Sequence, residues 1–280
     1  MSLLLANQLT VTLSIDSITA VYQSRGLRSR ILQQQHIALA PKNDSDAEKP
    51  LWHQATHALE NMLALMQIKP KTTLQIIIAN DFVRYLMLPQ QPIPMRPAEQ
   101  HAYAIAAYRE VYGAVADGWH IKLHDAAPNQ ATLVVAIDET LLETLKQISL
   151  KYQLKLISVQ PYLMRAYNDL SKQVGKLNGY LMIVESRRLL LLSLLKGQCQ
   201  NLRTISINAP AGDDWQLELK NLLARELLLD EIAGREVLVY APTQKNTKLD
   251  AIEGWQIKLV GQSDKKLAAD KPISLLEATI

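Results

Sequence analysis

Two pairs of histidines stand at spacings that could bind a metal ion. His53 and His57 lie four residues apart on a predicted helix, which is the spacing of the two histidine ligands in a helical zinc-hydrolase motif. Gln54 occupies the place of that motif's general-base glutamate and no third ligand follows, so we interpret the pair as a solvated helix flank. His120 and His124 share one face of a predicted strand and receive no role. A metal-dependent hydrolase is therefore the weakest functional hypothesis, and we expect no metal site.

The single cysteine offers little for nucleophilic or disulfide chemistry. No histidine neighbours Cys199 to act as a base, and the nearby Leu194, Leu195 and Leu202 indicate a structural setting. One cysteine can form neither an intramolecular disulfide nor a cysteine-based zinc site, which favours a reducing compartment. We therefore expect a cytoplasmic protein.

The charge pattern does not indicate a nucleic-acid or membrane-spanning protein. Thirty Lys and Arg stand against 27 Asp and Glu, and the net charge of +3 is not a concentrated basic field. Arg25, Arg28 and Arg30 cluster without interleaved aromatic residues, so we interpret them as a charged hairpin tip. The longest apolar stretch, residues 189–195, is far shorter than the ~20 residues of a membrane span.

Residues 1–10 lack the basic start of a signal peptide, so secretion is not expected.

Glycine is scarce, which limits the phosphate chemistry open to this chain. The sequence has 10 glycines in 280 residues, about half of what an ordinary usage of about 7% would give. Loops that cradle phosphates need glycine at fixed offsets, because backbone N–H groups must approach the phosphate closely. The hydrophobic content of 48% supplies a packed core, and the length favours two domains at about 100–200 residues each.

Hydrophobic periodicity predicts a mixed α/β chain whose first part contains seven strands and four helices. Strands are predicted at 10–22, 30–40, 74–79, 83–89, 119–124, 131–137 and 156–159, and helices at 51–67, 98–112, 138–150 and 161–170. Asn80 and Asp81 form the predicted turn between two apolar strands, and Asp138 is the predicted N-cap of the third helix.

A second strand-rich block follows residues 171–179, where two glycines and several polar residues indicate a boundary between domains 1–170 and 171–280. Three consecutive antiparallel strands, a helix and a buried strand are predicted there, at 180–184, 188–195, 201–207, 213–229 and 236–240. Both halves begin with a strand meander, pass through a helix and return to a buried strand. This order indicates a duplicated α/β unit.

The order of elements resembles the actin-like (ASKHA) fold of actin, sugar kinases and Hsp70-type chaperones, and more narrowly PilM, the platform protein of type IV pilus assembly. Ser14-Ile-Asp-Ser-Ile-Thr-Ala-Val stands in the place of the family's first hairpin. Val83-Arg-Tyr-Leu-Met-Leu-Pro matches the strand that leads into an inserted subdomain, about residues 90–155. Residues 119–123 and 131–138 also resemble the cytoplasmic domain of type II secretion protein L. The likeness covers residues 10–245 and implies a two-domain actin-like α/β fold.

Three positions depart from the nucleotide-binding members of that family. Those members carry Asp-x-Gly in each phosphate hairpin, but Ser17 replaces the first glycine here, although Asp16 and Thr19 are retained. The second hairpin reads Glu185-Ser-Arg-Arg and has no glycine, and Ala241-Pro stands where a Gly-Gly pair holds the adenosine. We therefore expect degenerate nucleotide loops, no bound cofactor and no catalytic residues. An ATP-binding actin-like protein, with Asp16 holding magnesium, is the rival hypothesis.

The resemblance implies a non-enzymatic adaptor at the inner-membrane platform of a type IV pilus or type II secretion-like system. In relatives, the cytoplasmic tail of a single-pass membrane partner lies between the first sheet and the inserted subdomain, which corresponds here to Val83–Leu88 and the helix at 98–112. Tyr and Arg often dominate such contacts, so the candidate contact residues are Arg84, Tyr85, Tyr103, Tyr108 and Arg109. An assembly ATPase and a second copy of the chain are further candidate partners. The expected location is cytoplasmic, peripheral at the bacterial inner membrane through partners.

Overall fold

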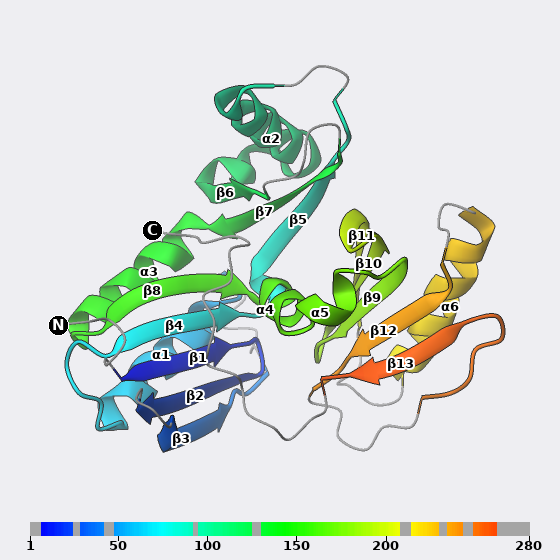
Figure 1. The fold of residues 1–280 in the computed structure, drawn as a ribbon. Coiled ribbons are helices and arrows are strands. Elements are labelled where there is room, and N and C mark those ends of the chain that lie inside the picture. The colour runs from blue at the N-terminus through cyan, green and yellow to red at the C-terminus, as the bar shows by residue number, and fades with distance from the viewer. Residues whose placement is uncertain are drawn as a thin grey trace.

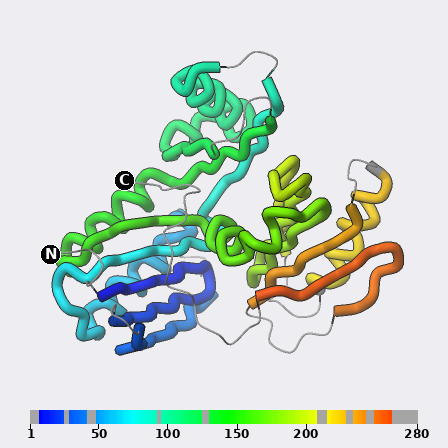
Figure 2. Tube along the Cα trace, in the orientation of Figure 1, coloured from blue at the N-terminus to red at the C-terminus, as the bar shows by residue number. Residues whose placement is uncertain are grey.

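A computed structural model describes residues 7–24, 29–41, 48–91, 95–124, 130–207, 214–229, 234–242 and 249–261. These residues form three β-sheets with helices packed against them (Figure 1). The amino-terminal strands lie on one side of the molecule and the carboxyl-terminal strands on the other (Figure 2). Arg25 and Arg28 of the predicted hairpin tip lie outside the described residues, as does part of the proline-rich segment before the helix predicted at 98–112.

The first sheet has five strands in the order β3-β2-β1-β4-β8. β1, β2 and β3 are antiparallel neighbours, whereas β4 and β8 add in parallel. The bounds are β1 (Gln8–Leu13), β2 (Ser17–Ser24), β3 (Arg30–Ala38), β4 (Thr73–Ile78) and β8 (Lys155–Pro161). The single strand predicted at 10–22 is wrong, because the chain turns back at residues 14–17. The alternation of β-branched residues continues through both strands and so conceals the turn.

Two helices, α1 (His53–Leu65) and α3 (Glu139–Lys151), pack next to each other against the first sheet. Each has an apolar stripe that is buried in the core, with Leu59 and Met62 on α1 and Leu141 and Leu145 on α3. Asp138 caps α3 as predicted, since its Oδ1 accepts a hydrogen bond from the Thr140 N–H at 2.9 Å. Its second carboxylate oxygen accepts from the Trp52 indole N–H at 3.0 Å, which ties α1 to the start of α3.

A small antiparallel sheet, in the order β5-β7-β6, carries its own helix and core. Its parts are β5 (Val83–Leu88), α2 (Pro97–Tyr112), the 3-10 helix η4 (Gly113–Gly118), β6 (Trp119–Leu123) and β7 (Thr132–Asp138). Ala104 and Tyr108 of α2 pack on Val134 and Ala136 of β7 in this core. These segments overlap the predicted insertion at 90–155 without coinciding with it, and the domain limits stay a prediction.

The second sheet repeats the topology of the first, in the order β11-β10-β9-β12-β13. Three strands are again antiparallel neighbours and two add in parallel. The bounds are β9 (Gly179–Val184), β10 (Arg188–Leu195), β11 (Gln198–Ser206), β12 (Glu236–Tyr240) and β13 (Gln256–Val260), with α6 (Asp214–Leu229) packed against them. The identical order confirms a duplicated unit, whereas β13 was absent from the predicted elements. α4 (Tyr162–Asp169) and α5 (Ser171–Val174) connect the two sheets.

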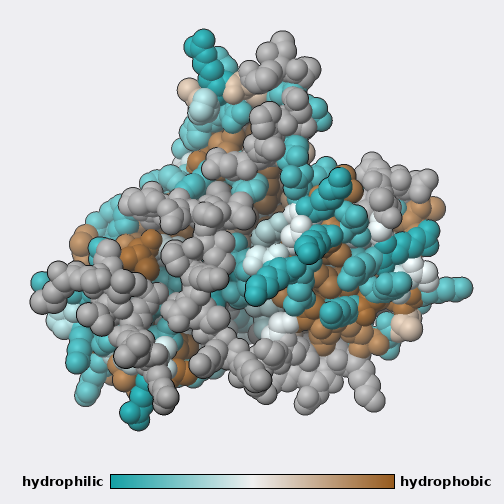
Figure 3. Space-filling model, in the orientation of Figure 1, coloured by the Kyte–Doolittle hydropathy of each residue, from teal (hydrophilic) through white to brown (hydrophobic). Residues whose placement is uncertain are grey.

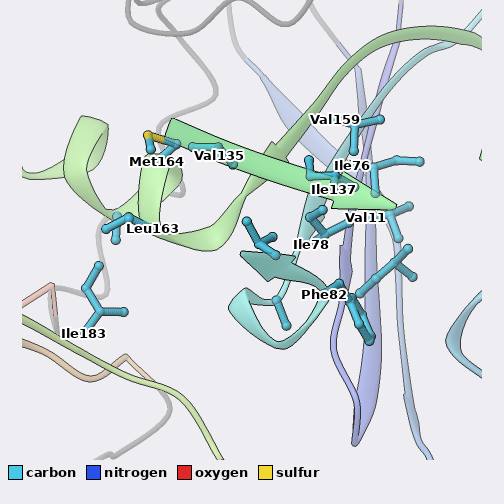
Figure 4. Packing of buried hydrophobic residues seen from close by; sticks show 14 of the residues in the cluster. Val11, Ile76, Ile78, Phe82, Val135, Ile137, Val159, Leu163, Met164 and Ile183 are labelled. Carbon is cyan, nitrogen blue, oxygen red and sulfur yellow. The ribbon is translucent and has the colours of Figure 1, made fainter. Parts of the chain in front are cut away.

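The two halves of the molecule, meaning the parts built on the first and second sheets, share one hydrophobic core. Figure 4 shows Ile76 and Ile78 of β4 beside Ile137 of β7, with Leu163 of α4 between this group and Ile183 of β9. Outside this core, hydrophobic patches lie between hydrophilic residues on the face seen in Figure 3. The side chains of the shared hydrophobic core fill the contact between the halves.

Among the described residues, no helix is long and apolar enough to cross a membrane.

Candidate functional site

The turn between β1 and β2 carries Asp16 and is closed by its own serines. The Ser14 hydroxyl donates to the Asp16 carboxylate, and the Ser17 N–H donates to the Ser14 hydroxyl oxygen at 3.0 Å. Partial burial would raise the pKa of Asp16, but hydrogen bonds from Ser14, Ser186 and Ser17 outweigh it and hold the pKa below its ordinary value. Ser186 belongs to the turn between β9 and β10, so turns from the two halves meet at Asp16.

A set of four polar residues joins the halves next to this turn. Asn80, fully buried at the start of the 3-10 helix η3 (Asn80–Phe82), donates its backbone N–H to Glu185 Oε1 at 3.2 Å and its side-chain amide to Oε2 at 2.5 Å. Arg188 Nη1 donates to the Asn80 carbonyl at 2.7 Å. Arg188 Nε also lies 3.5 Å from the Asp81 carboxylate. We call Asn80, Asp81, Glu185 and Arg188 the central bridge.

Burial shifts both carboxyl groups of the central bridge toward their protonated forms. Burial, followed by the negative charge of Asp81, raises the pKa of Glu185 to about 8, although hydrogen bonds from Asn80 and the charge of Arg188 act in the opposite direction. Burial also raises the pKa of Asp81, against the effect of Arg188 and with a further contribution from Asp16. Perturbed acids of this kind occur at functional sites and in structural networks alike.

Three backbone N–H groups in or beside the turns of the two halves form hydrogen bonds within the protein. The Ser17 N–H is bonded to Ser14, the Glu185 N–H to the Arg188 carbonyl at 2.9 Å, and the Asn80 N–H to Glu185. Thr19 lies within β2, where its hydroxyl is 2.9 Å from His36 Nδ1. Ala241, which follows β12, is fully buried in the core of the second sheet. The degenerate nucleotide loops stay a prediction.

Three of the five candidate partner-contact residues are accessible. Arg109 on α2 is exposed and pairs with Asp117. Tyr103 is half-buried on the same helix. Arg84 is half-buried on β5, and its Nη1 donates to the carbonyls of Asp81 and Val83, each at 3.0 Å.

Tyr85 and Tyr108 require a correction, because both are buried and cannot form a surface contact. The Tyr85 hydroxyl donates to Asn80 Oδ1 at 2.5 Å. The Tyr108 hydroxyl donates to the carbonyls of Arg84 and Val134, each at 2.9 Å. Burial raises the pKa of both hydroxyls, so they stay protonated donors. Their role is to fix β5 against the core and against α2.

The histidines and the cysteine singled out in the sequence lie away from the central bridge. His53 and His57 line a groove of about 740 Å³ between α1 and α3, together with Glu60 and Glu143. No group of three or more His, Cys, Asp or Glu side chains in the described part of the chain could hold a metal ion. His120 pairs with Glu139 at 3.5 Å. Burial raises the pKa of Cys199 to about 12, which leaves the thiol unreactive at neutral pH.

Sequence reasoning missed the part that Asn80 plays in this site. An asparagine after an apolar strand is typical of a turn, and the backbone does enter a 3-10 helix there. Apart from Tyr85, its bonding partners lie 83, 105 and 108 residues further along the chain. Only the near-continuous apolar run before it, residues 74–79, indicates that the site is buried at all.

The arrangement of sheets is that of known structures, although the sequence alone finds no match. No protein-family model and no curated protein matches the chain. A protein of unknown function from Bacteroides thetaiotaomicron with an actin-like ATPase fold is 14% identical, with a TM-score of 0.51 and coverage of 85% of this chain and 82% of that one. The chain has the two-domain actin-like fold.

Two further solved structures share this fold. The cytoplasmic domain of EpsL, an inner-membrane component of the type II secretion system of Vibrio cholerae, is 12% identical with a TM-score of 0.56, over 91% of this chain and 90% of that one. The PilM–PilN type IV pilus biogenesis complex contains a chain that is 10% identical with a TM-score of 0.58, over 83% of this chain and 80% of that one.

Proposed function

We propose that this protein is a non-enzymatic adaptor in the inner-membrane assembly platform of a type IV pilus or a type II secretion-like system. In this role it binds the cytoplasmic tail of a single-pass membrane protein and stays on the cytoplasmic side, peripheral to the membrane through its partners. The fold that it shares with the EpsL cytoplasmic domain and with a chain of the PilM–PilN complex supports this choice of machinery.

The central bridge is the observation that carries the adaptor proposal over the ATP-binding one. Glu185 and Arg188 fill the contact between the halves and are bonded to Asn80. A nucleotide needs free backbone N–H groups at the turns that hold its phosphates, and Ser17, Asn80 and Glu185 each use theirs within the protein. These bonds support a role in which partners bind the outer surface of the molecule.

The proposed partner surface is formed by β5 and α2. Arg109 supplies an exposed positive charge and Tyr103 a partly exposed ring, and both residue types are enriched among the dominant contacts of interfaces. Val111 at the end of α2 and Val115 in η4 are 59% and 62% exposed, which adds apolar area to the same unit. This combination suits a short peptide with both acidic and apolar side chains.

A binding measurement tests the proposal directly. The probe is a fluorescent synthetic peptide with the sequence of the cytoplasmic tail of a single-pass inner-membrane protein from the same pilus or secretion machinery, titrated by anisotropy. We expect Arg109→Ala and Tyr103→Ala each to weaken binding by about tenfold, since loss of a dominant contact costs more than about 1 kcal/mol.

Lys151→Ala is the matched control, because Lys151 is likewise exposed and paired with one acid, Glu60, but lies on α3. A scrambled peptide controls for sequence-independent attraction. If the wild-type chain does not bind the peptide, the proposed function is contradicted. Equal binding by the wild type and both α2 variants contradicts the proposed surface.

A further inference from the structure

Asn80 uses every polar atom that it buries, and its partners come from three separate elements. Its Oδ1 accepts from the Tyr85 hydroxyl of β5 at 2.5 Å and from the Leu163 N–H of α4 at 3.2 Å. Both of its N–H donors bond Glu185, and its carbonyl accepts from Arg188. One fully buried amide thus joins the inserted sheet, the connecting helix and the second sheet.

Ionisable groups from both halves of the molecule gather around the central bridge. Asp81 and Glu185 face Arg188, while Asp16 comes from the β1–β2 turn, Arg84 from β5 and Arg187 from the β9–β10 turn. Three acidic side chains and three arginines from both halves therefore meet at this place. Hydrogen bonds that involve a charged group are stronger than neutral ones where little water reaches them. A buried polar group that lost its hydrogen-bond partner there would destabilise the protein.

The same contacts set the position of β5 at its first residues. Arg84 donates to the Asp81 carbonyl and Tyr85 donates to Asn80. The first residues of β5 are therefore attached to the central bridge. β11 of the second sheet also lies beside β5. β5 is thus held from two directions by residues that belong to the second half or bond to it.

We propose that the central bridge is an internal clamp that holds the two halves in one arrangement without a bound ligand and lets the second half fix the position of β5. It performs with side chains the bridging that a ligand between the halves would otherwise provide. This inference goes beyond the proposed function, because it concerns how the partner surface is positioned and needs no partner to be tested.

Distances between the halves test the clamp. Nitroxide labels at Leu65→Cys on α1 and Leu228→Cys on α6, positions that are 76% and 85% exposed, are introduced into the full chain carrying Cys199→Ser. Double electron–electron resonance gives the distance distribution. Hydrogen exchange of the amides of residues 83–88 reports on β5 in the same samples.

Two variants weaken the clamp while keeping side-chain size. Glu185→Met offers no acceptor to the two N–H donors of Asn80, and Arg188→Lys keeps the charge but loses the planar group that contacts both Asn80 and Asp81. Arg187→Lys is the matched control, because Arg187 is the exposed neighbour and the change preserves its charge.

We expect one narrow distance distribution for the wild type and for Arg187→Lys. Both clamp variants should add a second or broader population and speed the exchange of the β5 amides by about tenfold or more. Circular dichroism establishes that each variant is folded, and Arg188→Lys decides the matter if Glu185→Met does not fold. Several distances in the wild type, or wild-type distances and exchange rates in the folded variants, would overturn the clamp.

Discussion

Glu185 places an ionisable group in the contact between the two halves, so the stability of that contact depends on pH. Burial and the nearby Asp81 raise its pKa from the ordinary 4.5 to about 8. The folded chain therefore keeps a proton on Glu185 in a pH range where the unfolded chain releases it. Folding stability must then fall as the pH rises through this range, because the folded state binds more protons than the unfolded state.

The substitution Glu185→Gln removes this titration and tests its sign. We expect the wild-type melting temperature, followed by differential scanning fluorimetry from pH 4 to pH 10, to fall more steeply between about pH 4.5 and pH 8 than that of the variant. About one pH unit above the folded pKa, where Glu185 is ionised in both states, the two profiles should run parallel. Parallel profiles over the whole range would show that Glu185 does not hold the proton.

The sequence predicts the structural role of some single residues and not of others. The absence of glycine at Ser17 and in the Glu185 turn is visible in the sequence, because glycine is required where a backbone must approach a phosphate. The burial of Tyr108 is not visible, since a tyrosine on a helix is equally compatible with a surface contact and with a hydroxyl that bonds two buried carbonyls. Only the tertiary contacts decide between these two roles.

Among the elements, the predictions were accurate where a strand or helix has a complete apolar pattern of its own. The helix predicted at 98–112 and the strands at 83–89 and 188–195 agree with α2, β5 and β10 to within a residue or two. The edge strand β13, which pairs in parallel with β12, was missed although Gln256-Ile-Lys-Leu-Val alternates polar and apolar residues.

The tip of the β10–β11 hairpin shows how closely one element is fitted to another. Lys196 and Gly197 have φ values of 50° and 76°, as a two-residue hairpin turn requires. A Cβ on Gly197 would lie 2.6 Å from the Cα of Gly175, just beyond α5. The Gly197 N–H also donates to the Leu177 carbonyl at 3.0 Å. The hairpin tip is therefore seated on the segment that connects the two halves.

Gly197→Ala should destabilise the protein by about 1–3 kcal/mol, since it combines an unfavourable positive φ with a backbone collision. Urea unfolding followed by circular dichroism measures the change. Gly118→Ala is the control, because no atom lies within 4 Å of the added Cβ there, and it should stay within about 0.5 kcal/mol of the wild type. If the two variants were equally stable, the seating of the hairpin tip on Gly175 would be refuted.

At the scale of the whole molecule, the repeated sheet order was predictable in outline and the way the halves join was not. Both sheets place three antiparallel strands before two parallel ones, and the sequence shows this as two similar successions of elements. The join depends on side chains that approach only after both sheets have formed, as Asn80 and Glu185 do. No periodicity encodes such a contact, because it links positions 105 residues apart.

The last prediction concerns nucleotide binding between the two halves of the molecule. A ligand that binds only the folded state at 100 times its dissociation constant stabilises that state by about 2.7 kcal/mol, or roughly 5 °C in melting temperature for a chain of this size. For MgATP to gain this, the Asn80 and Ser17 N–H groups would have to leave Glu185 and Ser14, and the energy of those bonds would offset the binding. We therefore expect about 5 mM MgATP to move the melting temperature by less than about 1 °C, with MgCl2 and sodium sulfate as controls for ionic strength. A saturable, magnesium-dependent rise of several degrees would instead mean that the halves open and that the protein uses its actin-like fold to bind nucleotide.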